Sequence, residues 1–390
     1  MVGVGHAATH WIAAIVYLLL PFLAESFDFS YAQAGGLIAV FQISSVCANL
    51  GSGVVVDVTG RRLIYQLISL LCGAGALALF AGASSFWGLA ALIAVIGAMN
   101  NLWHPAAISL LSTLYPKSRG YALSLHALGA NLGDAAAPAI IGLALTWLTW
   151  PIAASLAALP VVGVAAILYV VVAPAERRTR QLSSAEGGGQ PIAAYFTGLA
   201  RMTKDGVVIR LCLMAGLRTM TQVGLLTFLP LYFAHGLGLG PAAMGAALTL
   251  LQVGGFIASP LAGAWSDRIG RRPVVFAGIG LSTIVIFALA LIDNEIVFIA
   301  TVAALGFVLF AVRPVVHGWM MDLTPPNMAG TGISLMFGVQ AALGATMPVI
   351  GGVMADQFGL SSVFYLLAGT ILAANLMVLT LPAGTRVREA

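Results

Sequence analysis

Apolar runs recur along the whole chain, each about 20 residues long, which is the length an α-helix needs to cross the hydrocarbon core of a bilayer. Asp, Glu, Lys and Arg together make up only 8% of the 390 residues. Soluble domains contain roughly 25% of these residues. A soluble protein of this length would need far more polar surface to cover its core. The sequence therefore predicts an all-α membrane protein that crosses the bilayer many times.

Twelve such runs can be counted. We place the predicted spans near residues 4–24, 33–56, 63–83, 88–114, 120–145, 150–172, 207–233, 241–264, 273–292, 296–320, 329–353 and 361–381. An even number of spans puts both termini on the same side of the membrane. The longest polar stretch, 173–206, separates six spans from six. It predicts an N-terminal bundle over 1–172, a cytoplasmic linker over 173–206 and a C-terminal bundle over 207–390.

The distribution of charge predicts the orientation. Of the 17 Lys and Arg residues, all but Arg218 and Arg313 fall at span ends or in loops of one face. The loops of the opposite face have no Lys or Arg and carry the acidic residues Glu25, Asp28, Asp293 and Glu295. By the positive-inside rule, the basic face and both termini are cytoplasmic, in an inner membrane of the bacterial type. The formal charge of +4 is thus a signal of topology and does not indicate a nucleic-acid partner.

A shift of 210 residues superposes the two halves of the chain. It places "GVVVDVTGRR" at 53–62 on "GAWSDRIGRR" at 263–272. The matching positions are Gly53, Asp57, Gly60, Arg61 and Arg62 in the first half and Gly263, Asp267, Gly270, Arg271 and Arg272 in the second. Two parallel, related bundles are the arrangement expected of a transporter whose halves rock against each other.

The duplicated loop resembles the signature loop of the major facilitator superfamily, which joins the second and third spans of each half. "GH" early in the first span and "WHPAAISLLSTLYPKSRGYALSLHALGANLG" at 103–133 resemble the fosmidomycin-resistance branch of exporters. The resemblance covers essentially the whole chain and implies a fold of twelve helices in two pseudo-symmetric bundles. It also implies that the duplicated loop is a cytoplasmic gating latch. The alternative is a static anchor of topology.

Small residues recur every four positions in the fifth and eleventh spans. They include Pro138 and Gly142 in the fifth span and Gly344, Pro348 and Gly352 in the eleventh. This spacing puts them on one helix face, where small side chains allow helices to pack closely. The stripe resembles the antiporter-type motif of the superfamily, and that resemblance implies antiport.

Ionisable residues inside a membrane are costly, so each is a functional candidate. Two arginines lie within the predicted spans against one aspartate, Asp134, which predicts an electropositive interior and an anionic substrate. Arginine also presents a planar fork that suits a carboxylate, phosphate or phosphonate. The predicted substrate-binding residues are Arg218, Arg313, His317 and His104. The alternative is that one arginine pairs permanently with Asp134 and the other binds backbone carbonyls.

Three residues are candidates for proton coupling. His6 and His10 are one turn apart in the first span, and histidine titrates near neutral pH. Asp134 is the third candidate, and packing through hydrogen bonds is the alternative for any single histidine, including His126. Two histidines at this spacing could share a cation, but no carboxylate-rich or thiolate shell stands beside them in the sequence and a positive interior repels cations. We therefore predict no metal ligand and no cofactor.

These observations predict a proton-linked secondary transporter rather than an enzyme, since no constellation of nucleophile and base stands out. Its partners would be a small organic anion or anionic drug, protons and the lipid bilayer. We expect a monomer that moves its solute outward by alternating access around a site between the halves. The alternatives are a carboxylate importer on the same fold and a membrane sensor that does not transport.

Overall fold

A computed structural model describes residues 1–115, 118–183, 200, 202–324 and 329–382. Helices dominate these residues, and no strand occurs among them. Twelve helices in the described residues are long and apolar enough to cross a membrane. The predicted all-α class and the predicted number of spans are therefore confirmed.

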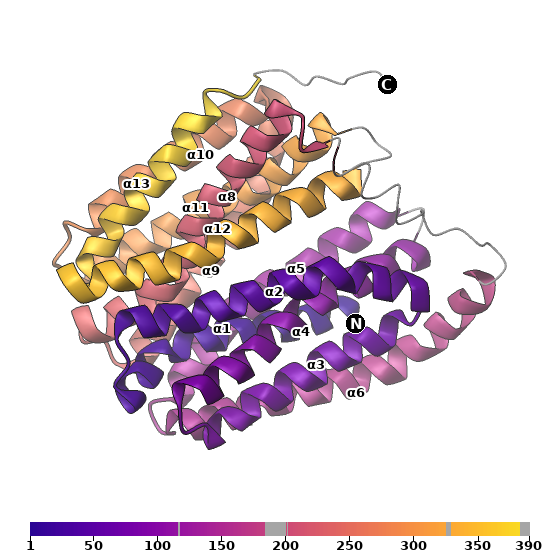
Figure 1. The fold of residues 1–390 in the computed structure, drawn as a ribbon, viewed down its shortest axis with the longest axis horizontal. Helices are drawn as coiled ribbons and strands as arrows, with labels where there is room; N and C mark the ends of the chain where they lie inside the picture. The colour runs from indigo at the N-terminus through magenta and orange to yellow at the C-terminus, as the bar shows by residue number, and fades with distance from the viewer. Residues whose placement is uncertain (116–117, 184–199, 201, 325–328, 383–390) are drawn as a thin grey trace. The chain divides into compact units, whose positions relative to one another are not determined.

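Within the part of the chain that the structure describes, each half contributes six long helices (Figure 1). The first half forms α1 (Val2–Phe27), α2 (Tyr31–Thr59), α3 (Arg62–Ala78) with the short η1 (Leu79–Gly82), α4 (Phe86–Leu114), α5 (Arg119–Ala144) and α6 (Trp150–Ser183). The second half forms α8 (Gly206–Leu231) with η3 (Tyr232–Gly236), α9 (Pro241–Ile269), α10 (Arg271–Leu289), α11 (Glu295–Leu323), α12 (Ala329–Phe358) and α13 (Ser361–Val378).

The sixth helix extends into the segment predicted as the linker. It continues past Pro174 through Ser183, in a stretch, residues 173–183, whose two Ala, one Glu and three Arg residues are good helix formers. Residues 184–199 and 201, which make up most of the remaining linker, lie outside the described residues.

The helices form two compact units. Unit 1 comprises residues 1–28, 40–190 and 240–249, and unit 2 comprises 29–39, 191–239 and 250–390. The units therefore follow the halves of the sequence except at the first turns of α2 and α9, each of which clusters with the other half.

Equivalent helices pack in the same way in the two halves. In the first half α1 packs on α5, and α3 packs on both α4 and α6. In the second half α8 packs on α12, and α10 packs on both α11 and α13. The turn glycines of the duplicated loop also match, since Gly60 and Gly270 have φ values of 62° and 93°. A left-handed conformation of this kind strongly favours glycine, which explains why this position is glycine in both copies.

Two glycines of α5 set its distance from α1. A Cβ added at Gly129 would collide with the backbone carbonyl of Gly3, and one added at Gly133 would collide with the carbonyl of Ala7. The α1–α5 pair is thus packed backbone against backbone, as small residues allow in membrane helices.

Gly129→Ala is expected to destabilise the protein because the new methyl group meets backbone that cannot rotate away. Overpacking of this kind costs about 1–3 kcal/mol, which exceeds the gain of up to ~1 kcal/mol that alanine brings to a helix. The matched control is Gly163→Ala in α6, where an added Cβ meets no atom within 4 Å. Thermal unfolding of the purified protein in detergent compares the two variants, and equal melting temperatures would contradict the prediction.

Candidate functional site

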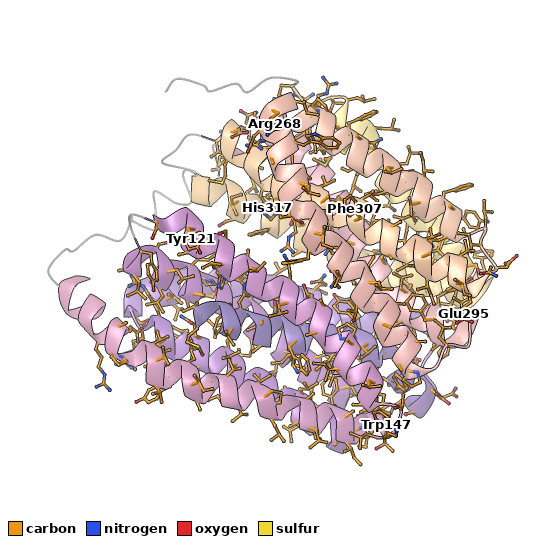
Figure 2. The ribbon with its side chains drawn as sticks, turned by 180° about the vertical axis from the view of Figure 1, so that it is seen from behind. Tyr121, Trp147, Arg268, Glu295, Phe307 and His317 are labelled. Atoms are coloured by element: carbon orange, nitrogen blue, oxygen red, sulfur yellow. The ribbon has the colours of Figure 1, made fainter. Side chains whose placement is uncertain are left out.

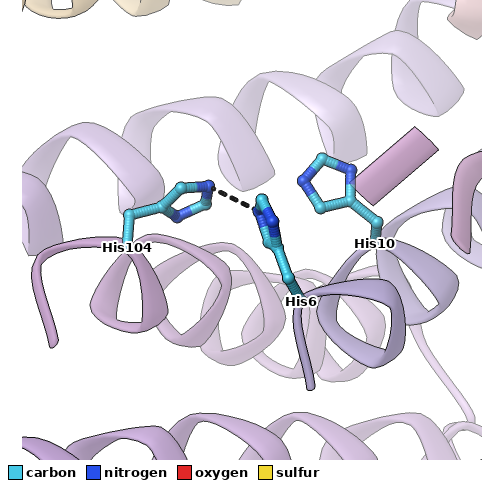
Figure 3. A group of neighbouring side chains, drawn as sticks. All are labelled: His6, His10 and His104. Atoms are coloured by element: carbon cyan, nitrogen blue, oxygen red, sulfur yellow. Dashed lines mark hydrogen bonds between the residues drawn. The ribbon is translucent and has the colours of Figure 1, made fainter. Parts of the chain in front are cut away.

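Three histidines of unit 1 converge from two helices. His6 and His10 lie one turn apart on α1, with ring centroids 4.8 Å apart, and His104 comes from α4. Nε2 of His6 lies 3.4 Å from Nε2 of His104. One ring nitrogen from each of the three side chains falls within 4.8 Å of the others (Figure 3). We call His6, His10 and His104 the histidine cluster.

Asp134 joins this cluster through His10. Nδ1 of His10 lies 3.0 Å from both carboxylate oxygens of Asp134. The two side chains are only 15% and 22% exposed. Their contact follows from the packing of α5 on α1. Asp134 thus pairs with a histidine, whereas the sequence left open a pair with an arginine.

His126 supports the cluster from α5. Its ring stacks on that of His6 with centroids 3.9 Å apart, and its backbone carbonyl accepts a hydrogen bond of 2.8 Å from Nδ1 of His6. Both side chains are buried, each with 5% of its surface exposed. His126 therefore holds the orientation of His6.

Unit 2 contains a separate cationic group. Arg218 of α8 is buried, and its Nη2 donates a hydrogen bond of 3.0 Å to the carbonyl of Leu309 on α11. Its Nε is buried without a partner among the described residues. Arg218 therefore has the carbonyl contact that the sequence analysis left open as an alternative, but one of its donors is not satisfied by it.

Arg313 and His317 complete the cationic group on α11. The side chain of Arg313 is exposed, and its charge acts on both Arg218 and His317. The ring of His317 packs edge-on against Phe337, with centroids 5.2 Å apart. In Figure 2, Arg268 and Glu295 label opposite ends of the helices of unit 2, and His317 lies between these two levels. The like charges here are those of Arg218 and Arg313, and they favour the binding of an anion because a bound negative charge relieves their repulsion.

The intramembrane charges are segregated by unit. The predicted substrate residues Arg218, Arg313 and His317 belong to unit 2, whereas His104 belongs to unit 1 with the histidine cluster. Asp134 also lies in unit 1. The positive surplus counted over the predicted spans is thus a property of unit 2, and unit 1 combines several histidines with a carboxylate.

The second copy of the duplicated loop forms an ion-pair network. Nη1 of Arg271 donates to Oδ1 of Asp267 at 2.6 Å, and Nε donates to Oδ2 of Asp322 at 3.0 Å. Arg272 donates to the carbonyl of Leu379 at 2.7 Å. Asp322 was not among the predicted residues, because the repeat places a serine, Ser112, at the equivalent position. The sequence feature that could have identified Asp322 is an acidic residue at the end of a predicted span on the face rich in Lys and Arg.

The first copy of the loop is held differently. Glu176 of α6 accepts a hydrogen bond of 2.7 Å from the backbone N–H of Leu63, at the start of α3. Arg61 is exposed and Arg62 is half-buried, while the side chain of Asp57 lies outside the description. The remaining predicted latch positions are Gly53 and Gly263, where an added Cβ would meet nothing within 4 Å.

The small-residue stripes lie at close helix contacts. In unit 1, a Cβ at Gly142 would meet Gly245 of α9, and one at Gly245 would meet the carbonyl of Pro138. In unit 2, a Cβ at Gly352 would meet Ala32 of α2, and one at Gly35 would meet the carbonyl of Pro348; Gly344 is buried in α12. Asp356, which the sequence analysis did not single out, accepts hydrogen bonds from the N–H groups of Tyr31 and Ala32 at the start of α2.

The chain is similar in sequence to known transporters, in two of the following cases over more than nine-tenths of its length. The chain is 24% identical to the multidrug efflux pump Tap of Mycolicibacterium fortuitum, over 99% of this chain and 94% of the pump. It is 26% identical to the hexuronate transporter of Escherichia coli, over 92% of this chain and 87% of that protein. A stretch covering 40% of the chain is 34% identical to the multidrug resistance protein MdtG of Serratia proteamaculans, over 38% of that protein.

Solved structures share the fold. The D-xylose–proton symporter superposes with a TM-score of 0.78 at 16% identity, over 100% of this chain and 98% of that one. A bacterial homologue of the human lysosomal transporter Spinster superposes with a TM-score of 0.72 at 16% identity, over 97% and 93%. The family model described as "Major Facilitator Superfamily" matches residues 2–244 and 211–390. These matches do not assign a branch, so the resemblance to fosmidomycin-resistance exporters stays a prediction. The chain belongs to the major facilitator superfamily of membrane transporters.

Proposed function

We propose that this transporter exports a small organic anion or anionic drug in exchange for protons, by alternating access of its two halves. A multidrug efflux pump and a multidrug resistance protein among its relatives support the outward direction. The cationic group of Arg218, Arg313 and His317 carries the proposal for the substrate class. Arg313 is the leading contact, because its side chain is exposed on α11 whereas that of Arg218 is buried.

The proposed route for protons is the pair of His10 and Asp134. A neutral His10 donates its Nδ1–H to the carboxylate, and a proton added at Nε2 then creates an imidazolium whose charge the carboxylate offsets. His6 is the proposed neighbour for transfer, since its ring lies against that of His10. Because α1 carries the histidines and α5 carries the carboxylate, a change in protonation alters the contact between these two helices.

Several features of organisation belong to the same proposal. Both termini and the duplicated loop lie on the cytoplasmic side of a bacterial-type inner membrane, and the protein acts as a monomer. The network of Arg271, Asp267 and Asp322 serves as the latch of the second half. The bundles correspond to residues 1–172 and 207–390, joined by the linker.

The second candidate is import of a carboxylate by proton symport. The similarity to a hexuronate transporter over most of the chain favours it, because a hexuronate is itself a carboxylate. The two candidates share the cationic group and differ in the direction in which protons drive the anion.

Transport into proteoliposomes under an imposed pH gradient tests the proposal. Radiolabelled organic anions and phosphonates are supplied outside, and accumulation is expected when the lumen is acidic, as exchange for protons requires. Accumulation driven by an acidic exterior would instead establish symport. Absence of saturable flux for every anion under either gradient, with transport of neutral or cationic solutes, would contradict the proposed substrate class.

A further inference from the structure

The hydrogen bonds of the histidine cluster fix which ring nitrogens carry protons. Nδ1 of His6 lies 2.8 Å from the carbonyl oxygen of His126, and Nδ1 of His104 lies 2.9 Å from that of Asn100. A carbonyl oxygen only accepts hydrogen bonds, so both Nδ1 atoms must be donors. In the neutral state, the Nε2 atom of each ring therefore presents a lone pair.

These two lone pairs face each other. The Nε2 atoms of His6 and His104 are 3.4 Å apart, and no hydrogen lies between them when both rings are neutral. His10 donates its Nδ1–H to Asp134 in the same way, which leaves its Nε2 with a lone pair as well. Figure 3 shows this nitrogen of His10 turned towards His6. Three electron-pair donors thus converge on one small region, where an electrophile could accept all three lone pairs.

We propose that the histidine cluster binds a divalent transition-metal cation of the zinc type through Nε2 of His6, His10 and His104. Imidazole nitrogens suit zinc, and three histidines with a water in the fourth position form a known zinc coordination. Two nitrogens bound tetrahedrally to one zinc at about 2.0–2.1 Å are about 3.3–3.4 Å apart, the separation that His6 and His104 already have. One nitrogen of each of the three rings lies within 4.8 Å of the others, so the rings are already close enough for binding to require only a small approach of His10.

Outer hydrogen bonds prepare the three rings for this role. Histidines that bind metals almost always donate their other N–H group to a carbonyl or carboxylate, which fixes the tautomer and the ring orientation. All three rings have such a partner, namely the carbonyls of His126 and Asn100 and the carboxylate of Asp134. Asp134 also supplies a negative charge beside the cation. The arginines that made the interior positive on sequence grounds belong to unit 2.

A bound cation would join α1 to α4 and, through His10 and Asp134, to α5. It would occupy the Nε2 positions that protons use in the proposed coupling, so zinc and protons would compete for them. The site does not depend on the identity of the transported anion, because none of its ligands belongs to the cationic group of unit 2. The proposed zinc site would therefore stand even if the protein were found not to transport anions.

Zinc titration of the purified full-length protein in detergent at neutral pH tests the site. Calorimetry is expected to give one saturable site, and X-ray absorption is expected to show zinc bound by imidazole nitrogens at about 2.0 Å. Replacing a ligand in His104→Gln should weaken binding at least 100-fold. Asp134→Asn, which removes only an outer partner, should weaken it about 10- to 100-fold. His235→Gln is the matched control, since this histidine lies in η3 of unit 2.

Two outcomes would overturn the assignment. One is the absence of saturable zinc binding in the unaltered protein, which would make the cluster a site for protons alone. The other is equal binding by the His104→Gln and His235→Gln variants, which would place the zinc elsewhere. Melting temperatures measured without metal show whether each variant is folded, and His104→Ala provides a second ligand variant if His104→Gln is unstable.

Discussion

Replacing Arg313 with alanine is expected to abolish saturable anion transport while leaving membrane insertion intact. Arg313 is exposed on α11, one turn from His317 in the same helix, and its charge acts on Arg218. Losing one partner of a charge-assisted contact to an anion costs about 2–5 kcal/mol, equivalent to about 30- to several-thousand-fold in affinity. Initial rates in proteoliposomes over a range of anion concentrations measure this as a rise in KM beyond the accessible range.

Two further variants separate loss of the contact from damage to the protein. Arg313→Lys keeps the positive charge but loses the planar fork, so partial recovery of transport is expected. Arg210→Ala removes an exposed arginine near the start of α8, whose Nε donates to the carbonyl of Gly206 in the same helix, and it should transport normally. Unchanged anion kinetics in Arg313→Ala, with normal expression, would remove Arg313 from the proposed site.

The sequence was sufficient to predict the architecture. Hydropathy revealed twelve spans because a bilayer requires long apolar helices whose backbone groups are all satisfied internally. The repeat was visible because the backbone conformation of a turn restricts which residues can occupy it. Gly60 and Gly270 both have a left-handed conformation, which favours glycine. These signals depend on neighbouring residues and on helix length, which a sequence displays directly.

The site was less predictable because it depends on contacts between helices. The spacing of His6 and His10 is a property of one helix, and it was predicted. The approach of His104, 98 residues from His6 in sequence, depends on how α4 packs beside α1. The same limit applied to the charge of the interior. A sum of charges over all spans does not show that Asp134 belongs to unit 1 and the two arginines to unit 2. No metal site was predicted, because the sequence shows no carboxylate-rich or thiolate shell beside His6 and His10 and the interior was counted as positive. The position of His104 beside these two histidines is visible only in the structure.

Asp134→Asn is expected to uncouple transport from the pH gradient. The asparagine side chain can still accept the hydrogen bond from Nδ1 of His10, so the α1–α5 contact keeps its shape. It cannot offset the charge of a protonated His10. Two unit charges 4 Å apart attract by about 4 kcal/mol at an effective dielectric constant of 20, so protonation of His10 loses stabilisation of this order.

The decisive measurement compares two modes of transport in the same proteoliposomes. Accumulation driven by the pH gradient should disappear in Asp134→Asn, whereas exchange of labelled for unlabelled anion without a gradient should continue, because exchange returns the protein loaded with solute and needs no net proton movement. Asp134→Glu keeps the charge and should retain part of the accumulation. If Asp134→Asn still accumulated anion under the gradient, the proton would have to be carried by another group. If exchange were lost as well, Asp134 would be required for the movement of the helices themselves, because the anion contacts proposed in unit 2 do not include it.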